Sequence, residues 1–122
     1  MLTEEIKNAI QGETDNTAET LKKYSRDASV FELQPSVVVY PKNAEDVKNL
    51  VRFVNRKKAS GLTDISITAR SGGTDMSGGP LNTSIIADFS RHINRLHSVS
   101  GDYAIVEPGI FYRDFEKATL AH

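Results

Sequence analysis

The sequence predicts an α/β fold, or α+β in broader terms, in which a small parallel or mixed β-sheet carries flanking helices. Three observations lead to it: a β-branched run at residues 36–40, an amphipathic helical pattern at residues 43–58, and two further apolar runs at residues 64–70 and 84–89. Strand, helix, strand, loop, strand is the order typical of such a sheet. A length of 122 residues suits one domain with a modest core.

Residues 1–24 are expected to form a helical segment ahead of the main domain, which takes up residues 25–122. A first helix over residues 3–11 begins with Thr3 as its N-cap and is stopped by Gly12. Its apolar residues recur at helical spacing, at Leu2, Ile6, Ala9 and Ile10. A second short helix is expected over residues 17–24.

The central strand and helix carry the clearest local signals. The strand at residues 36–40 lies between two prolines and is expected to be buried on both faces. The helix at residues 43–58 has Asn43 as its N-cap, acidic residues in its first turn, basic residues in its last turn and Gly61 as its stop. Its inward stripe is Val47, Leu50, Val51 and Val54.

The second half of the chain predicts a strand, a hairpin and a helix after the loop that follows residue 70. In the strand at residues 64–70, Ile65 and Ile67 share one face. Residues 93–99 are expected to pair with residues 103–107 across the turn Ser100-Gly101-Asp102. A final helix over residues 111–122 should turn its apolar side chains inward, at Phe111, Phe115, Ala118 and Leu120.

Composition narrows the classes of function. A formal net charge of −1, from 15 basic and 16 acidic residues, gives no broad electrostatic footprint for nucleic acid. The absence of cysteine excludes disulfides and thiolate metal ligands. No apolar run reaches the roughly 18 residues of a transmembrane segment, and the polar, acidic N-terminus is not a signal peptide. We therefore expect a cytoplasmic protein.

A glycine-rich loop is the main candidate for chemistry. Residues 71–80 contain four glycines together with the hydroxyl residues Ser71, Thr74 and Ser77. Glycine permits positive φ and close approach of the backbone, so that successive N–H groups can point into one anion-binding nest. Such a nest can hold a diphosphate with little formal positive charge nearby.

Two common phosphate motifs do not fit this loop. Gly73 and Gly78 have the glycine spacing of a Walker A loop, but Gly79 and Pro80 follow where that motif needs lysine and a hydroxyl residue. The Rossmann fingerprint opens a helix, whereas this loop leads into another strand. From the pattern alone, a structural turn and a phosphate site fit equally well.

A resemblance to a known family favours the phosphate site. Residues 69–79 resemble the pyrophosphate loop of FAD-binding domains of the p-cresol methylhydroxylase (PCMH) type, in the vanillyl-alcohol oxidase superfamily. Four other segments match this family in the same order: residues 35–41, residues 43–47, residues 85–90 with 93–96, and residues 104–110. The pattern is most similar to glycolate oxidase and D-lactate dehydrogenase subunits. The chain is thereby identified as resembling the first subdomain of such a domain.

The resemblance implies a set of cofactor-binding residues. It places main-chain N–H groups of Ser71, Gly72, Gly73, Thr74 and Asp75 on the FAD diphosphate, with Arg70, Ser77 and Gly78 as further members of the site. Some relatives attach flavin covalently through a histidine at the position held here by Thr74, so we expect non-covalent FAD. Arg70 could either help to hold the diphosphate or form a structural ion pair.

Other polar residues have simpler interpretations. His92 and His97 have no acidic partner at metal-site spacing, and we expect solvated surface histidines. Asp88 is expected to cap a turn at the end of its strand.

The expected function is the FAD-binding part of an oxidoreductase that oxidises a small 2-hydroxy acid by hydride transfer to flavin. The resemblance implies a second subdomain and a substrate-binding cap beyond this chain, which ends inside a predicted helix, so we expect a truncated form that is inactive alone. Exposed apolar surface would then favour self-association. Alternatives are a non-catalytic module of the same fold that binds a partner protein or nothing, and a phosphate site unrelated to flavin.

Overall fold

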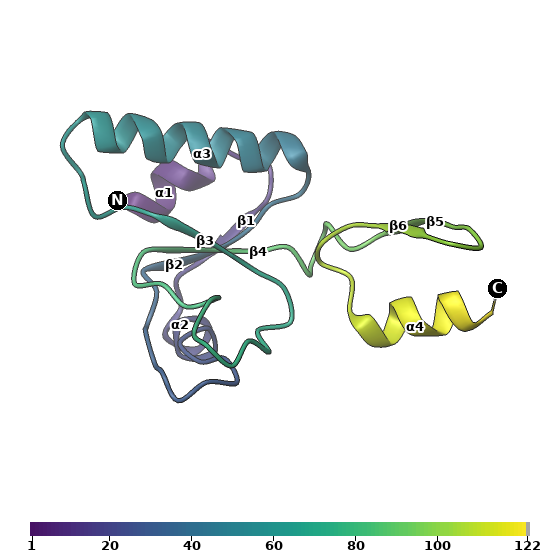
Figure 1. The fold of residues 1–122 in the computed structure, drawn as a ribbon. Helices are drawn as coiled ribbons and strands as arrows, with labels where there is room; N and C mark the ends of the chain where they lie inside the picture. The colour runs from purple at the N-terminus through teal and green to yellow at the C-terminus, as the bar shows by residue number, and fades with distance from the viewer. Residues whose placement is uncertain (122) are drawn as a thin grey trace.

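The computed structural model describes residues 1–121 and has a mixed α/β architecture, as expected (Figure 1). Ten helices and strands are found within this range. In chain order they are α1 (Leu2–Lys7), β1 (Glu13–Asp15), α2 (Ala18–Lys23), β2 (Val37–Tyr40), α3 (Ala44–Ala59), β3 (Ile67–Arg70), β4 (Ile85–Asp88), β5 (Leu96–Val99), β6 (Ala104–Val106) and α4 (Tyr112–Leu120). They form a four-stranded sheet in the order β1-β2-β4-β3 and a separate hairpin of β5 and β6.

The four-stranded sheet is mixed. Strand β4 pairs in parallel with both β2 and β3, whereas β1 pairs antiparallel with β2. Every residue of the two central strands β2 and β4 is buried, which confirms the strand predicted to be covered on both faces. Parallel strands end at the same edge of a sheet. The last residues of β2, β3 and β4, which are Tyr40, Arg70 and Asp88, therefore lie at one edge.

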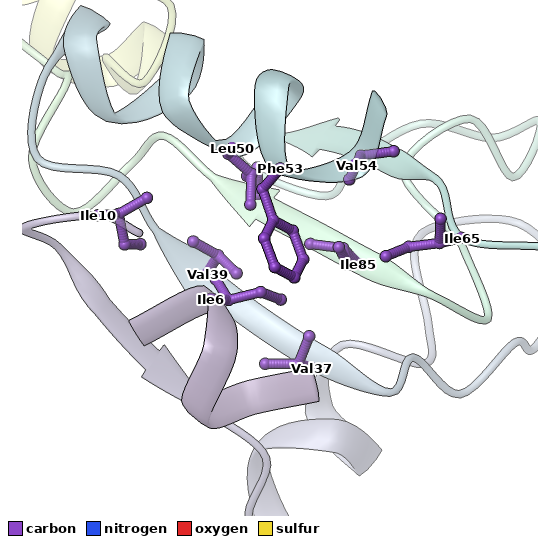
Figure 2. Close-up of a cluster of buried hydrophobic side chains, with 10 residues drawn as sticks. Ile6, Ile10, Val37, Val39, Leu50, Phe53, Val54, Ile65 and Ile85 are labelled. Atoms are coloured by element: carbon purple, nitrogen blue, oxygen red, sulfur yellow. The ribbon is translucent and has the colours of Figure 1, made fainter. Parts of the chain in front are cut away.

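The core has two parts, one on each face of this sheet. The larger part lies between the sheet and helices α1 and α3 (Figure 2). Its members are Ile6, Ile10, Val37, Val39, Leu50, Phe53, Val54, Ile65, Ile85 and Ala87. The smaller part, towards α2, consists of Tyr24, Val38, Tyr40 and Ile86. Alternate residues of β2 therefore serve opposite faces, as the two-residue period of a strand requires.

Helix α3 confirms most of the predicted helix. The side chain of Asn43 accepts a hydrogen bond from the main-chain N–H of Asp46 at 3.0 Å, as an N-cap should. The predicted inward stripe is wrong at one position: Val51 is exposed, and Phe53 is buried instead. The buried face follows Leu50, Phe53 and Val54, so it is rotated from the predicted stripe around the helix axis.

The N-terminal segment departs from prediction in two ways. Helix α1 ends at Lys7 rather than at residue 11, and Met1 rather than Thr3 is its N-cap, without a side-chain hydrogen bond. Strand β1, at Glu13–Asp15, was not predicted. The buried carboxylate of Asp46 gives the physical reason, because it accepts hydrogen bonds at 2.8 Å from the main-chain N–H groups of Gln11, Gly12 and Lys42. These bonds fix a bend at residues 11 and 12, after which the chain continues into β1.

The C-terminal part is a hairpin and a helix with little burial. Strands β5 and β6 pair antiparallel, which confirms the predicted hairpin. Helix α4 confirms the final helix, whose predicted last residue, 122, lies outside the described range, but none of its residues is buried. Phe111 is 52% exposed and Leu120 is 80% exposed, so their predicted inward orientation is wrong. The two-stranded hairpin is too small to cover both sides of the helix, and only Phe115, Ala118 and Thr119 are half-buried.

Candidate binding site

The predicted glycine-rich loop leaves the sheet at the end of β3 and returns towards β4. Residues 71–80 contain neither helix nor strand. Gly73 has φ +67° and Gly78 has φ +83°, in the left-handed region that residues with a Cβ rarely adopt. The backbone path of the loop therefore depends on glycine at these two positions.

The first part of this loop surrounds a hollow of about 410 Å³. Its lining residues are Ala69, Arg70, Ser71, Gly72, Gly73, Thr74, Asp75, Gly79 and Pro80. The structure thus brings together six of the eight predicted site residues. Ser77 and Gly78 do not line the hollow, and the outer side of Gly78 faces the ring of Phe31.

Main-chain donors are the most distinctive feature of the hollow. Within residues 1–121, the N–H groups of Ser71, Gly72, Gly73, Thr74 and Asp75 donate to no protein acceptor. A run of consecutive unpaired N–H groups on a glycine-bearing turn is the arrangement of an anion-binding nest. An anion with several acceptor oxygens can satisfy several of these groups at once.

The second part of the loop satisfies its own donors. The carboxylate oxygen Oδ1 of Asp75 accepts from the N–H of Ser77 at 2.5 Å and from that of Gly79 at 3.5 Å. Because Asp75 already uses these donors, the amide of Ser77 is not available to a ligand in this conformation. The candidate anion contacts are therefore concentrated in residues 71–75.

Arg70 lies beneath the loop rather than across its opening. Its Nη2 donates to the carbonyl oxygen of Arg26 at 2.8 Å and its Nη1 to that of Tyr24 at 3.3 Å. The guanidinium also stacks on the Tyr24 ring, with 4.9 Å to the ring centroid. A Cβ atom at Gly73 would lie 2.4 Å from Nη2, so the loop rests closely on this guanidinium. Within the described residues Arg70 forms no ion pair, so the structural ion pair that was one of its two expected roles is absent there. Its guanidinium instead donates hydrogen bonds to two main-chain carbonyl groups.

The edge of the sheet next to the loop is fixed by a buried tyrosine and aspartate. The hydroxyl of Tyr24 donates to Asp88 Oδ2 at 2.5 Å. The other oxygen, Oδ1, accepts from the N–H and the hydroxyl of Ser90 at 2.7 and 2.6 Å, which confirms the turn-capping role predicted for Asp88. Burial, together with the nearby Asp88 carboxylate, raises the pKa of Tyr24, so its hydroxyl remains a donor at neutral pH.

The two histidines have acidic partners that the sequence did not reveal. His92 Nε2 lies 2.6 Å from Glu13 Oε2, and His97 Nε2 lies 3.2 Å from Glu107 Oε1. Although burial opposes it, the hydrogen bond with His92 lowers the pKa of Glu13. His92 and Glu13 are 79 residues apart in sequence, whereas His97 and Glu107 lie across the hairpin, 10 residues apart. His97 is exposed, as expected of a surface histidine, and His92 is partly buried. In the part of the chain that the structure describes, no group of three or more His, Asp or Glu side chains is placed to hold a metal ion.

The arrangement of the loop fits a diphosphate better than a compact metal or acid–base centre. Five unpaired N–H groups line an open hollow at the carboxyl edge of parallel strands, where ligands of open α/β sheets commonly bind. No lysine lines the hollow, so the backbone provides the donors. This geometry agrees with the profile of one protein family, described as an FAD binding domain, which matches residues 35–122.

The chain belongs to this FAD-binding domain family. Its cofactor is FAD. Among curated relatives, D-2-hydroxyglutarate dehydrogenase of Escherichia coli (strain K12) is 35% identical over 105 residues, which cover 82% of this chain and 10% of that protein. The enzyme of the same name from Pantoea ananatis (strain AJ13355) is 34% identical over 105 residues, with the same coverage. The chain thus spans about a tenth of the length of these relatives.

Solved enzyme structures share the fold, in agreement with the fold that the resemblance implies. The 4-ethylphenol oxidase from Gulosibacter chungangensis matches with a TM-score of 0.78 and 24% identity, over 98% of this chain and 24% of that chain. The structure of p-cresol methylhydroxylase with substrate bound matches with a TM-score of 0.77 and 20% identity, over 98% and 24% of the two chains. The family profile begins at residue 35, whereas these two fold matches cover nearly the whole chain.

No helix within residues 1–121 is long and apolar enough to cross a membrane.

Proposed function

We propose that this chain forms the diphosphate-binding part of an FAD site in an oxidoreductase that oxidises a small 2-hydroxy acid. The observation that carries the proposal is the set of five unpaired main-chain N–H groups at Ser71–Asp75. The family match supports FAD as the ligand. The names of the curated relatives, which are dehydrogenases of D-2-hydroxyglutarate, support a 2-hydroxy acid as the substrate class of the whole protein. Lactate and glycolate belong to the same class.

The role of these residues is binding and orientation. The N–H groups of Ser71, Gly72, Gly73, Thr74 and Asp75 donate to the diphosphate oxygens, and their partial positive charges offset its two negative charges. Once bound, FAD supplies a ring that can accept a hydride. We assign no catalytic residue to this chain, because the substrate must be positioned against the flavin ring by other parts of the protein.

The remaining predicted site residues act around this set. Asp75 holds the amides of Ser77 and Gly79, which gives the second half of the loop its shape. Gly78 turns the chain at positive φ. Arg70 lines the hollow and adds a positive charge there. Its guanidinium donates to two carbonyl groups, so these donors are not left without hydrogen-bond partners.

A charge-reversal experiment tests the diphosphate assignment. Thr74 is exposed and lines the hollow, so Thr74→Asp should leave the fold intact while adding a negative charge next to the phosphates. We expect the FAD dissociation constant to rise by about tenfold or more, since like charges a few ångströms apart cost about 1–4 kcal/mol near a protein surface. Isothermal titration of the chain with FAD measures this constant.

The matched control is Thr63→Asp, the same substitution at an exposed threonine before β3, outside the lining of the hollow. The control variant should bind FAD with the affinity of the unchanged chain. Equal affinities for all three proteins, or no binding of FAD by the unchanged chain, would contradict the proposal.

We also propose that the flavin is held without a covalent bond. Thr74 occupies the position at which some relatives carry a flavin-linking histidine, and a threonine hydroxyl is a far weaker nucleophile at neutral pH. Acid precipitation of the flavin-loaded protein should release all of the yellow colour into the supernatant. Colour retained in the washed pellet would contradict non-covalent binding.

A second candidate is a module that contacts another protein surface through its C-terminal part. Tyr103, Ile105, Phe111 and Tyr112 are all more than half exposed, with values of 62%, 52%, 52% and 72%. Exposed large apolar and aromatic side chains of this kind favour protein contacts, including self-association. The visible spectrum separates the candidates: a chain loaded with FAD and then desalted should remain yellow under the first proposal and be colourless if the module only binds protein.

A further inference from the structure

A segment upstream of the family match contacts the glycine-rich loop at residues 71–80, called the diphosphate loop from here on. Residues 24–33, here called the strap, follow helix α2 and precede the matched region, which begins at residue 35. The strap and the loop approach each other on the α2 side of the sheet (Figure 1). The residues that join them are more than 40 positions apart in sequence.

Three contacts join the strap to the beginning, middle and end of the loop. The guanidinium of Arg70 donates to the carbonyl groups of Tyr24 and Arg26 at 3.3 and 2.8 Å. The N–H of Ala28 donates to the carbonyl oxygen of Asp75 at 3.0 Å. The ring of Phe31 lies against Gly78, so closely that a Cβ there would approach Cδ2 to 3.1 Å.

The strap is itself held in shape by local hydrogen bonds. The N–H of Leu33 donates to the carbonyl oxygen of Ser25 at 3.0 Å, which closes the segment into a loop. The hydroxyl of Ser25, a residue that is 2% exposed, donates to the carbonyl oxygen of Lys22 at 2.7 Å. Arg26 and Glu32 form an ion pair at 2.6 Å. A segment closed in this way can act as a fixed support rather than as a loose linker.

We propose that the strap positions the diphosphate loop, and that Arg70 acts as a positioning residue within this contact; the proposal rests on the proposed function of the loop. The first two contacts fix residues 70 and 75, and the five unpaired N–H groups lie between these anchors or at them. Glycine-rich segments lose much conformational entropy when they are ordered. The strap supplies this order before the ligand arrives, which raises affinity without touching the ligand.

The geometry of Arg70 makes the proposal specific. A guanidinium presents its donors as a planar fork and stacks on aromatic rings, whereas a lysine ammonium does neither. Arg70→Lys therefore keeps the positive charge beneath the hollow but loses the two carbonyl contacts and the Tyr24 stack. If Arg70 positions the loop, Arg70→Lys should weaken FAD binding. If Arg70 acts through its charge alone, Arg70→Lys should bind FAD as well as the unchanged chain does.

The experiment uses the full chain with two variants and two controls. The variants are Arg70→Lys and Phe31→Ala. Arg52→Lys, on an exposed part of α3, is the control for the first, and Leu62→Ala, where the residue is 48% exposed against 56% for Phe31, is the control for the second. The readouts are ¹⁵N relaxation of the Ser71–Asp75 amides in the free chain and the FAD dissociation constant, with the melting temperature measured in parallel.

We expect Arg70→Lys to weaken FAD binding by about tenfold and Phe31→Ala by about threefold, since each loses one or two contacts of ordinary strength. Both variants should show greater motion of the loop amides, and both controls should match the unchanged chain. Unchanged loop motion in both variants overturns the proposal, whether or not FAD binds. Failure of the unchanged chain to bind FAD overturns the proposed function instead, and the relaxation data still decide the role of the strap.

Discussion

The body of the molecule, residues 1–90, contains nearly all of the buried side chains, whereas its C-terminal unit, residues 91–121, is mostly exposed. In residues 1–90, a four-stranded sheet is covered on both faces, and all fifteen buried hydrophobic residues lie between Ile6 and Ala87. In residues 91–121, the hairpin and α4 leave most large apolar side chains exposed, and Gly109 is the one buried residue of this described part. The glycine-rich loop at residues 71–80 belongs to the body, with Phe111 of the C-terminal unit close to Gly72.

This difference separates a supported loop from an exposed apolar surface. A loop that must hold consecutive N–H groups in one direction needs a rigid support, and strand β3, its pairing with the buried strand β4, and the strap supply it. The C-terminal unit instead offers apolar surface next to the loop. Stability should therefore depend strongly on the body and weakly on α4.

The largest expected effect contrasts two leucines. Leu50 is 1% exposed in the core below α3, and Leu120 is 80% exposed on α4. Leu50→Ala should lower the free energy of unfolding by about 3 kcal/mol, because it removes buried methyl groups and leaves a cavity. Leu120→Ala should change it by less than about 0.5 kcal/mol. Urea denaturation measures both values, and similar losses for the two variants would show that α4 is as well supported as the body.

A smaller effect is expected at the junction between the two parts. A Cβ at Gly109 would lie 2.0 Å from the carbonyl oxygen of Phe89 and 2.5 Å from that of Ile93, both rigid backbone atoms. Gly109→Ala should therefore cost about 2 kcal/mol by overpacking and should release the hairpin from the end of β4.

The matched control is Gly101→Ala, since a Cβ at Gly101 would meet nothing within 4 Å. Amide hydrogen exchange should quicken in residues 93–110 of the Gly109 variant and stay slow in β2. Unchanged exchange at the junction would mean that the unit is anchored by other contacts.

The smallest effect concerns acid stability of the hairpin. The N–H of Arg95, with a smaller contribution from His97, holds the pKa of Glu107 below its ordinary value of 4.5, although burial works against it. A carboxyl group with a lower pKa in the folded state stabilises the fold above about pH 4.5, and this contribution is lost as the pH falls through the folded-state value.

Glu107→Gln cannot be protonated at this position, so its hairpin should show a weaker pH dependence between pH 5 and 3 than that of the unchanged chain. Amide exchange of β5 and β6 at several pH values provides the measurement. An identical pH dependence in the two proteins would show that the hydrogen bonds of Glu107 contribute nothing to folding.

Local sequence signals were enough to predict the central elements. The cap at Asn43 and the β-branched run of β2 express preferences of the chain itself, and both appear in the structure. Strand β1 could not be predicted in this way, because Glu and Asp are uncommon in strands. Its place is set by pairing with β2 and by the hydrogen bonds of Asp46 to the preceding residues 11 and 12. Sequence periodicity likewise could not separate Val51 from Phe53, since the direction of α3 depends on its packing.

The sequence predicted the loop that forms the candidate site, but not the hydrogen bonds and ion pairs of the side chains around it. The glycines of residues 71–80 indicated a turn with free N–H groups. The direction of Arg70 depends on two carbonyl groups more than 40 residues upstream, and the partner of His92 comes from β1, 79 residues upstream. Contacts of this range arise only from the fold.

The most direct test of the central claim is an FAD titration of the ¹⁵N-labelled chain, followed through its amide resonances, with inorganic pyrophosphate as a second ligand. We expect the largest shifts from both ligands at Ser71, Gly72, Gly73, Thr74 and Asp75. The amides of Ser77 and Gly79, already bonded to Asp75, should move less. Shifts that cluster elsewhere, or none at these five residues, would contradict the account.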